Sequence, residues 1–494
     1  MRAVLSGLAW LHRYLGIGLC LLFAMWFGTG IVMVFVPYPA LLPQERFAGL
    51  QPLDVSRCCV TIQSALARSG LTDPPRQVRM SMVGARPVFH FHPWQGKVRS
   101  VYADTGEALG ELNAGLALAV AQRFMPGQSA KHAAFEEYDQ WSVPNRWNAY
   151  RPFHRIAMND AAGTELYISA LSGEVVRDTT RLERGWNWVG SVLHWIYPTA
   201  LRKHPGLWDQ VVWWLALAGV ISAVSGAVLG VWRFRFKRQP SQLKRSPFRG
   251  WMYWHHVLGL VCMIIVLTWI VSGWLSMDHG RLFSEPSPSQ AQEEHFAGGP
   301  LRLSSAQRNA RETALIRHVD GDLPKEIELR QFAGTLIYVL RYDAWRRGVT
   351  HASASAPGVW PRVHERAIAT AAEGLLGSYP LAATTTLETY DTYYYDPKRQ
   401  APLPVVRLRF DDPARTWFHV DPSSALLLER MDSSRRAYRW WYDALHKLDL
   451  PVFQSRPVLR RTIVTALCAL GFAFSITGSV IGWRRLTRQA EKAS

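Results

Sequence analysis

The sequence predicts an integral membrane protein with four transmembrane helices in two pseudo-symmetric halves, each half carrying an α+β domain outside the membrane. Two observations lead to this fold class. The 494 residues contain four apolar stretches of roughly the 20 residues that cross a bilayer core. The same order of elements also occurs twice along the chain, which indicates duplication of a domain plus two spans.

The four spans divide the chain into seven segments. The apolar stretches cover residues 14–36, 211–231, 257–277 and 462–483. We therefore predict transmembrane segments at 1–36, 208–233, 251–277 and 458–494, the last with a short tail. The α+β domains, each ending in an amphipathic helix before the membrane, are predicted at 37–207 and 278–457, and a basic loop at 234–250.

Charge in the loop between the second and third spans predicts the orientation. Residues 233–249 hold seven Lys and Arg residues and no acidic residue, and short loops of this kind stay in the cytoplasm. Both termini are then cytoplasmic, and both domains lie on the far side of the lipid bilayer. Since this topology accounts for much of the net charge of +18, we predict no nucleic-acid partner.

The spacing of apolar residues predicts the elements of the two domains, with strict alternation for the strands. Predicted helices cover 55–69, 116–124, 305–316 and 362–376. Predicted strands cover 78–82, 88–92, 98–103, 155–158, 165–169, 326–330, 336–341, 405–410 and 416–420. The five cysteines predict no disulfide framework, because three lie in spans and Cys58 and Cys59 are adjacent. The sequence has no C-x-x-C-H motif for covalent haem.

Histidine recurs at matching positions of the two halves. An offset of 243 residues maps His12 onto His255, and an offset of 252 maps Leu193-His194 onto Leu445-His446. Under a pseudo-twofold axis along the membrane normal, His12 would face His255 near the cytoplasm, and His194 would face His446 on the far side. Two such pairs suit two haems, each held by two axial imidazoles.

The competing interpretation is that these histidines only lie among the Trp and Tyr side chains typical of a membrane interface. His256 complicates the first pair, because it adjoins His255 and aligns with Arg13. It is therefore an alternative ligand or a hydrogen-bonding neighbour. His90 and His92 share one face of a predicted strand, a pattern more typical of surface histidines than of a two-ligand metal site.

Several short motifs together resemble the PepSY-associated transmembrane helix family of bacterial inner-membrane proteins. They are LHRYLG at 11–16, DTGE at 104–107, SGE at 172–174, LH at 193–194, HHVLG at 255–259 and LHK at 445–447. The likeness covers nearly the whole chain, although DPSSA at 421–425 departs from the family's Thr-Gly turn. It implies a bacterial inner-membrane location, periplasmic domains, haem b on the matching histidines and, as in some members, reduction of ferric siderophores.

These patterns predict a transmembrane electron conduit. Electrons would pass from an unidentified cytoplasmic donor through two haems to a ferric siderophore or other ferric chelate in the periplasm. The donor must be a separate molecule, because no glycine-rich nucleotide-binding motif follows a predicted strand. Two alternatives stay open: a non-enzymatic membrane protein that binds or regulates envelope proteins, and a quinone-linked cytochrome b. A transporter is disfavoured, because the spans lack carboxylates at midplane depth.

Overall fold

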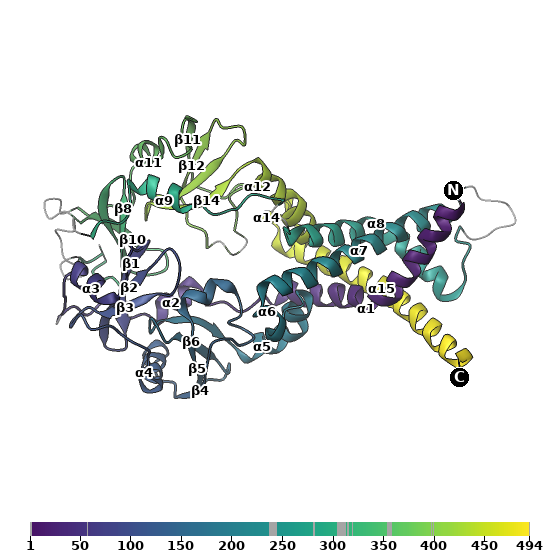
Figure 1. Ribbon diagram of the computed structural model, residues 1–494, viewed down its shortest axis with the longest axis horizontal. Helices are drawn as coiled ribbons and strands as arrows, with labels where there is room; N and C mark the ends of the chain where they lie inside the picture. The colour runs from purple at the N-terminus through teal and green to yellow at the C-terminus, as the bar shows by residue number, and fades with distance from the viewer. Residues whose placement is uncertain are drawn as a thin grey trace. The chain divides into compact units, whose positions relative to one another are not determined.

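The computed structural model describes residues 2–56, 58–236, 245–279, 282–303, 313, 316–318, 320–352, 358–396, 398 and 400–493. The chain forms two compact units (Figure 1). The membrane unit comprises Met1–Tyr38, Glu183–Phe283 and Ala437–Ser494. The soluble unit comprises Pro39–Leu182 and Ser284–Arg436.

Four long helices build the membrane unit: α1 (Arg2–Phe35), α7 (Pro205–Arg233), α8 (Gly250–Ser276) and α15 (Pro457–Ala493). Each contains an 18-residue window apolar enough to cross a membrane, of which no more than 28% is buried in the protein. The remaining apolar surface is free to face lipid. The four predicted spans are therefore confirmed as long apolar helices. Figure 1 shows both chain termini at the same end of this bundle.

Small residues allow these helices to approach closely. Gly28 of α1 lies against Phe472 of α15, and Gly471 of α15 lies against Phe27 of α1. A methyl group at Gly471 would come within 2.4 Å of the Phe27 ring. Phe27 also belongs to the buried core of the bundle, with Cys262, Val266, Trp269 and Cys468.

Short helices precede α7 and α15. Before α7 come α5 (Arg181–Asn187), the π-helical turn η2 (Trp188–Val192) and α6 (Thr199–Arg202). Before α15 come α12 (Ser433–Tyr438), the π-helical turn η4 (Arg439–Ala444), α13 (Leu445–Lys447) and α14 (Pro451–Gln454). A π-helical turn thus directly precedes each Leu-His pair, and such turns occur frequently at functional sites.

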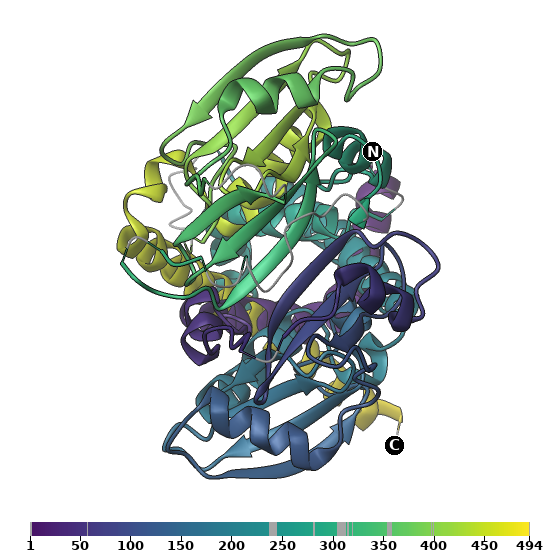
Figure 2. The same cartoon turned by 90° about the vertical axis from the view of Figure 1, so that its left-hand side faces the viewer.

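The soluble unit contains a six-stranded antiparallel sheet shared by the two halves of the chain. Its order is β10-β9-β8-β1-β2-β3. The strands are β1 (Gln77–Val83), β2 (Arg86–His92), β3 (Arg99–Tyr102), β8 (Glu326–Phe332), β9 (Thr335–Arg341) and β10 (Arg347–His351). In Figure 2 the purple strands of the first half lie beside the green strands of the second.

Each half adds a four-stranded antiparallel sheet. The first contains β4 (Ala130–Glu136), β5 (Phe153–Met158), β6 (Glu165–Ser169) and β7 (Val175–Thr179). The second contains β11 (Leu381–Leu387), β12 (Val405–Phe410), β13 (Trp417–Asp421) and β14 (Leu426–Met431). Among the described residues, the helices of the unit include α2 (Pro43–Gly49), α3 (Ile62–Ser69), α4 (Ala114–Phe124), η1 (Asn145–Tyr150), α9 (Gln290–Ala297) and α11 (Glu365–Ala372). The predicted α+β class is therefore confirmed.

Some predicted elements differ in extent. The helix predicted at 55–69 begins only at Ile62, because the Thr61 hydroxyl caps it by accepting the Ser64 N–H at 3.2 Å. Strands β4, β7, β10, β11 and β14 were not predicted. Most of the helix predicted at 305–316, and residues 237–244 of the basic loop, lie outside the described residues. Cys58 and Cys59 form a disulfide that the sequence analysis did not predict.

A buried network of charges ties the two halves of the soluble unit together. Arg79 of β1 contacts Glu174 of the first half and Glu326 of β8, both at 2.8 Å. Arg46 contacts the same two glutamates. Burial raises the pKa of Glu174 and Glu326, but the surrounding guanidinium groups outweigh it, so the pKa of both carboxyl groups lies below its usual value.

We expect the soluble unit to lose stability in acid. Because the folded pKa of these carboxyl groups lies below the unfolded value of about 4.3, they stabilise the fold above that pH. The stabilisation is lost as the pH falls toward the folded values. Glu326→Gln should cost about 3 kcal/mol at pH 7, since it removes one of the two carboxylates that Arg46 and Arg79 share, and should flatten the acid dependence. Urea unfolding followed by circular dichroism measures both.

The matched control is Asp73→Asn, because Asp73 is exposed. It should change the free energy of unfolding by less than about 0.5 kcal/mol. A Glu326→Gln protein as stable as the parent at pH 7 would contradict the stabilising role of the network.

Candidate functional site

The structure brings the predicted histidines together in two pairs within the membrane unit. His12 of α1 and His255 of α8 have ring centres 6.4 Å apart and ring planes at 39°. His194 and His446, which follow the two π-helical turns, have ring centres 6.3 Å apart and ring planes at 67°. We call these the inner and the outer histidine pair, after the predicted topology. Each pair takes one residue from each half.

The spacing suits a metal ion between the two rings. Metal–imidazole bonds of about 2 Å place two opposed nitrogens about 4 Å apart, and the ring centres lie about 1 Å further on each side. The expected separation of ring centres is therefore about 6 Å. Both pairs match it.

Hydrogen bonds fix which nitrogen of each ring carries the proton. His12 Nδ1 lies 3.0 Å from the Ser222 carbonyl oxygen, and His446 Nδ1 lies 3.2 Å from that of Trp269. Because a carbonyl oxygen only accepts, both Nδ1 atoms must donate. Each neutral ring then carries its lone pair on Nε2, the form in which imidazole binds a metal.

The other two rings have the same tautomer for a different reason. His194 Nδ1 lies 2.9 Å from the Thr29 hydroxyl, and His255 Nδ1 lies 3.0 Å from the Thr477 hydroxyl. Each hydroxyl donates its hydrogen to a helix carbonyl, that of Met25 at 2.7 Å or of Phe474 at 2.5 Å. Both hydroxyls can therefore only accept from the rings. Among the described residues, no Nε2 atom of the four histidines has a hydrogen-bond partner.

These hydroxyl partners are themselves duplicated. Ser272 contacts His446 Nδ1 at 3.2 Å and is the counterpart of Thr29, while Ser225 contacts His12 Nδ1 at 3.3 Å and is the counterpart of Thr477. Hydrogen-bond partners of this kind orient metal-binding histidines. The offsets of 243 and 252 that relate the histidines also relate Thr29 to Ser272 and Ser225 to Thr477, so the duplication could have indicated this role.

Four glycines lie against the rings. A methyl group at Gly226 would lie 2.6 Å from His12 Cε1, and one at Gly273 would lie 3.1 Å from His446 Cε1. A methyl group at Gly478 would lie 3.4 Å from His255 Cε1, and one at Gly30 would lie 3.9 Å from His194 Cε1. Gly226 in particular cannot carry a side chain unless His12 moves.

A cavity of about 410 Å³ surrounds the inner histidine pair. Its volume falls within the range of small-molecule sites. His12 and His255 line it together with apolar side chains such as Phe23 and Phe474, and its lining includes no acidic residue. The Phe474 ring stacks on that of His255, with centres 4.9 Å apart. The residues present therefore fit a flat apolar cofactor whose metal is held by two imidazoles.

His256 has different hydrogen-bond partners from its neighbour His255. Its Nδ1 contacts the Ser246 hydroxyl and its Nε2 contacts the Gly230 carbonyl oxygen, each at 2.9 Å. Both ring nitrogens are thus occupied within the protein. The Gly230 carbonyl lies in the last turn of α7, so His256 connects the end of α7 to the segment before α8.

His90 and His92 of the soluble unit also have partners. His90 is buried between the hydroxyls of Ser81 and Ser100, at 3.0 and 3.1 Å, and burial lowers its pKa to about 4. His92 accepts a hydrogen bond from Arg79 Nε, and burial lowers its pKa to about 3. Among the described residues, no group of three or more His, Cys, Asp or Glu side chains is arranged to hold a metal ion.

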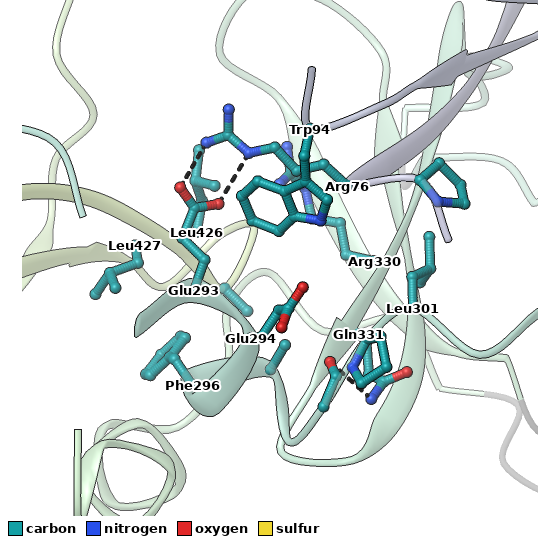
Figure 3. Close-up of a pocket in the computed structure, with 15 residues that line it drawn as sticks. Arg76, Trp94, Glu293, Glu294, Phe296, Leu301, Arg330, Gln331, Leu426 and Leu427 are labelled. Atoms are coloured by element: carbon teal, nitrogen blue, oxygen red, sulfur yellow. Dashed lines mark hydrogen bonds and ion pairs between the residues drawn. The ribbon is translucent and has the colours of Figure 1, made fainter. Parts of the chain in front are cut away.

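The soluble unit has a small pocket of about 60 Å³ (Figure 3). Arg76 forms two hydrogen bonds with Glu293 at its edge, at 2.8 and 2.9 Å, and lies over the Trp94 ring. The volume admits a few water molecules. It cannot enclose a multidentate iron chelate.

Comparison with known proteins identifies the family. Residues 9–312 match the model of the PepSY-associated TM region. A search of curated proteins found no significant match. The match covers more than half of the chain and includes three of the four apolar helices. The protein therefore belongs to the PepSY-associated TM region family.

Proposed function

We propose that this protein carries electrons across the membrane through two non-covalently bound b-type haems, one on each histidine pair. The observation that carries the proposal is that all four rings have the same tautomer and that both pairs have the same spacing. In each pair the ring centres are 6.3–6.4 Å apart, and each Nδ1 donates to the protein. An iron held by two imidazoles has no open position, so such a haem supplies one-electron transfer.

The depth of the two pairs supports a transmembrane route. Thr29, which contacts His194, lies 17 residues after His12 on α1. At 1.5 Å per residue the two pairs are about 25 Å apart along the helix. This is most of the thickness of a bilayer core, so one pair belongs near each face. The arginines at the ends of α7 and α15 favour the cytoplasm for the inner pair.

We further propose that the electron acceptor is a ferric chelate in the periplasm of a bacterium, such as a ferric siderophore, and that the donor is a cytoplasmic reductant. Oxygen-donor ligands prefer hard cations, so adding an electron to ferric iron weakens their hold on it. The pocket in Figure 3 is too small for a chelate. The chelate would therefore bind outside this pocket.

One observation favours a second candidate, a quinone-linked cytochrome. His279 Nδ1 lies 2.6 Å from Asp209 Oδ2, and the His279 ring packs against Trp213 at 4.8 Å. An imidazole–carboxylate pair beside aromatic rings, at the outer ends of α7 and α8, can accept a proton released by a quinol. The proposed donor would then be a membrane quinol.

Substitution of the histidines tests cofactor binding. We expect two haems per chain, with His12→Ala or His255→Ala each removing one and His194→Ala or His446→Ala each removing the other. His256→Ala is the neighbouring control, and we expect it to retain both haems, because the ring nitrogens of His256 bond to the protein. Pyridine haemochrome assays and reduced-minus-oxidised spectra measure the loss. Full haem content in all four variants would end the proposal.

Gly226→Ala tests the close approach to His12. The added methyl group would lie 2.6 Å from the ring, so the ring must move, and the inner haem should be lost or become high-spin. Gly18→Ala is the control, because nothing lies within 4 Å of that position. Absorption and electron paramagnetic resonance spectra report the ligation. Unchanged low-spin signals in Gly226→Ala would contradict the assigned ring positions.

Electron transfer itself can be followed in the purified protein. After anaerobic reduction, a ferric siderophore is added together with a ferrous trap. We expect haem reoxidation matched by trapped ferrous iron, and a large loss of rate in His194→Ala. If no ferric chelate reoxidises the reduced haems, but a quinol reduces the haems of the oxidised protein, the quinone-linked function is the correct one.

A further inference from the structure

Arginines from three helices line the cavity around the inner histidine pair. They are Arg13 of α1, Arg233 of α7 and Arg485 of α15. None of the three has a carboxylate partner among the described residues. The cavity lining otherwise holds apolar side chains, the histidines, and the small residues of the helix contacts. Unpaired guanidinium groups at the mouth of an apolar cavity favour an anionic ligand group.

Two of these arginines lie at the same sequence distance from the glycines that contact His12 and His255. Arg233 lies seven residues after Gly226, the residue against His12, and Arg485 lies seven residues after Gly478, the residue against His255. Seven residues are nearly two helical turns, so each arginine shares a helix face with its glycine, about 10 Å nearer the arginine-rich end of the bundle.

The same two arginines are counterparts in the internal duplication. Arg233 and Arg485 are related by the offset of 252 that relates Gly226 to Gly478. The pseudo-twofold axis that exchanges His12 and His255 therefore also exchanges Arg233 and Arg485. A ligand held on this axis would meet one arginine on each side of it.

The preference for arginines at cytoplasmic helix ends explains why Arg233 and Arg485 are present, but it does not explain why their side chains line the cavity. Arg484, the neighbour of Arg485, is exposed, does not line the cavity and lies near the Trp251 ring. Arg485 is half-buried and does line the cavity. The position facing the cavity thus carries a charge that topology alone would not require there.

We propose that Arg233 and Arg485 bind the two propionate carboxylates of the haem held between His12 and His255. This assignment rests on the proposed function. A guanidinium group forms paired, charge-assisted hydrogen bonds with a carboxylate. The two arginines would orient the cofactor, with its carboxylate edge toward the arginine-rich end of the bundle and its apolar edge toward Phe23 and Val266.

The test compares haem with haem dimethyl ester, which lacks the two charges. The full-length chain carries His194→Ala so that only the inner site binds, is produced without haem, and is titrated in detergent by its Soret band. We expect Arg233→Gln and Arg485→Gln each to weaken haem binding about tenfold and both together about a hundredfold. Binding of the ester should not change. Arg484→Gln should bind both ligands as the parent does.

Other outcomes separate the rival explanations. Equal affinity of the parent for haem and ester, or equal weakening of both ligands in the variants, would overturn the proposal. Variants that lose bound phosphatidylglycerol but keep the parent's preference for haem would show that the arginines hold lipid phosphate, which also overturns it. A parent that binds neither ligand through two imidazoles would instead refute the proposed function.

A second measurement does not require the haem-free chain to fold. Haem-loaded protein is mixed with an excess of apomyoglobin, and the rate of haem transfer is followed. Release should be about tenfold faster for each arginine substitution and unchanged for Arg484→Gln. Equal release rates in all variants would overturn the proposal.

Discussion

The hydrogen bond at each Nδ1 is the interaction on which the candidate site depends. Without it, an imidazole can carry its proton on either nitrogen and rotate freely. The carbonyl oxygens of Ser222 and Trp269 and the hydroxyls of Thr29 and Thr477 can only accept from the rings. Each partner therefore fixes both the tautomer and the direction of its ring. Among the described residues, the Nε2 atoms of all four rings have no hydrogen-bond partner, and the ring spacing within each pair suits a shared metal.

Because the chain is internally duplicated, the two histidine pairs have the same construction. Counterpart residues supply the histidines, the glycines against them and the hydroxyls that orient them, so each pair is built from equivalent parts of the two halves. The soluble unit also pairs equivalent strands of the two halves, but at one equivalent position the two halves carry opposite charges. Arg79 and Glu328 occupy the third positions of β1 and β8 and stand opposite each other in the antiparallel register. Two identical halves would place like charges there, so the opposite charges favour pairing of the unlike halves.

The two units rely on different forces. In the soluble unit, apolar cores beneath the sheets are joined by a buried network in which every glutamate contacts several arginines. In the membrane unit lipid supplies no hydrophobic drive for helix association, so glycine contacts and hydrogen bonds from Ser, Thr and His side chains take its place. The polar groups of the bundle thus serve its packing as well as its candidate chemistry.

The sequence by itself determined the four apolar helices, the α+β class and the family, because the apolar runs and the duplicated motifs are local or simply periodic. It also indicated which histidines would meet, since an internal repeat implies a symmetry axis. Which of His255 and His256 faces His12 required tertiary structure, because adjacent residues differ only in which side of the helix they face. The same holds for strands β4 and β11, whose side chains are largely not buried and leave no strong alternation. The partners of each Nδ1 and the arginines at the cavity also come from other helices, so only the packing of the bundle could decide them.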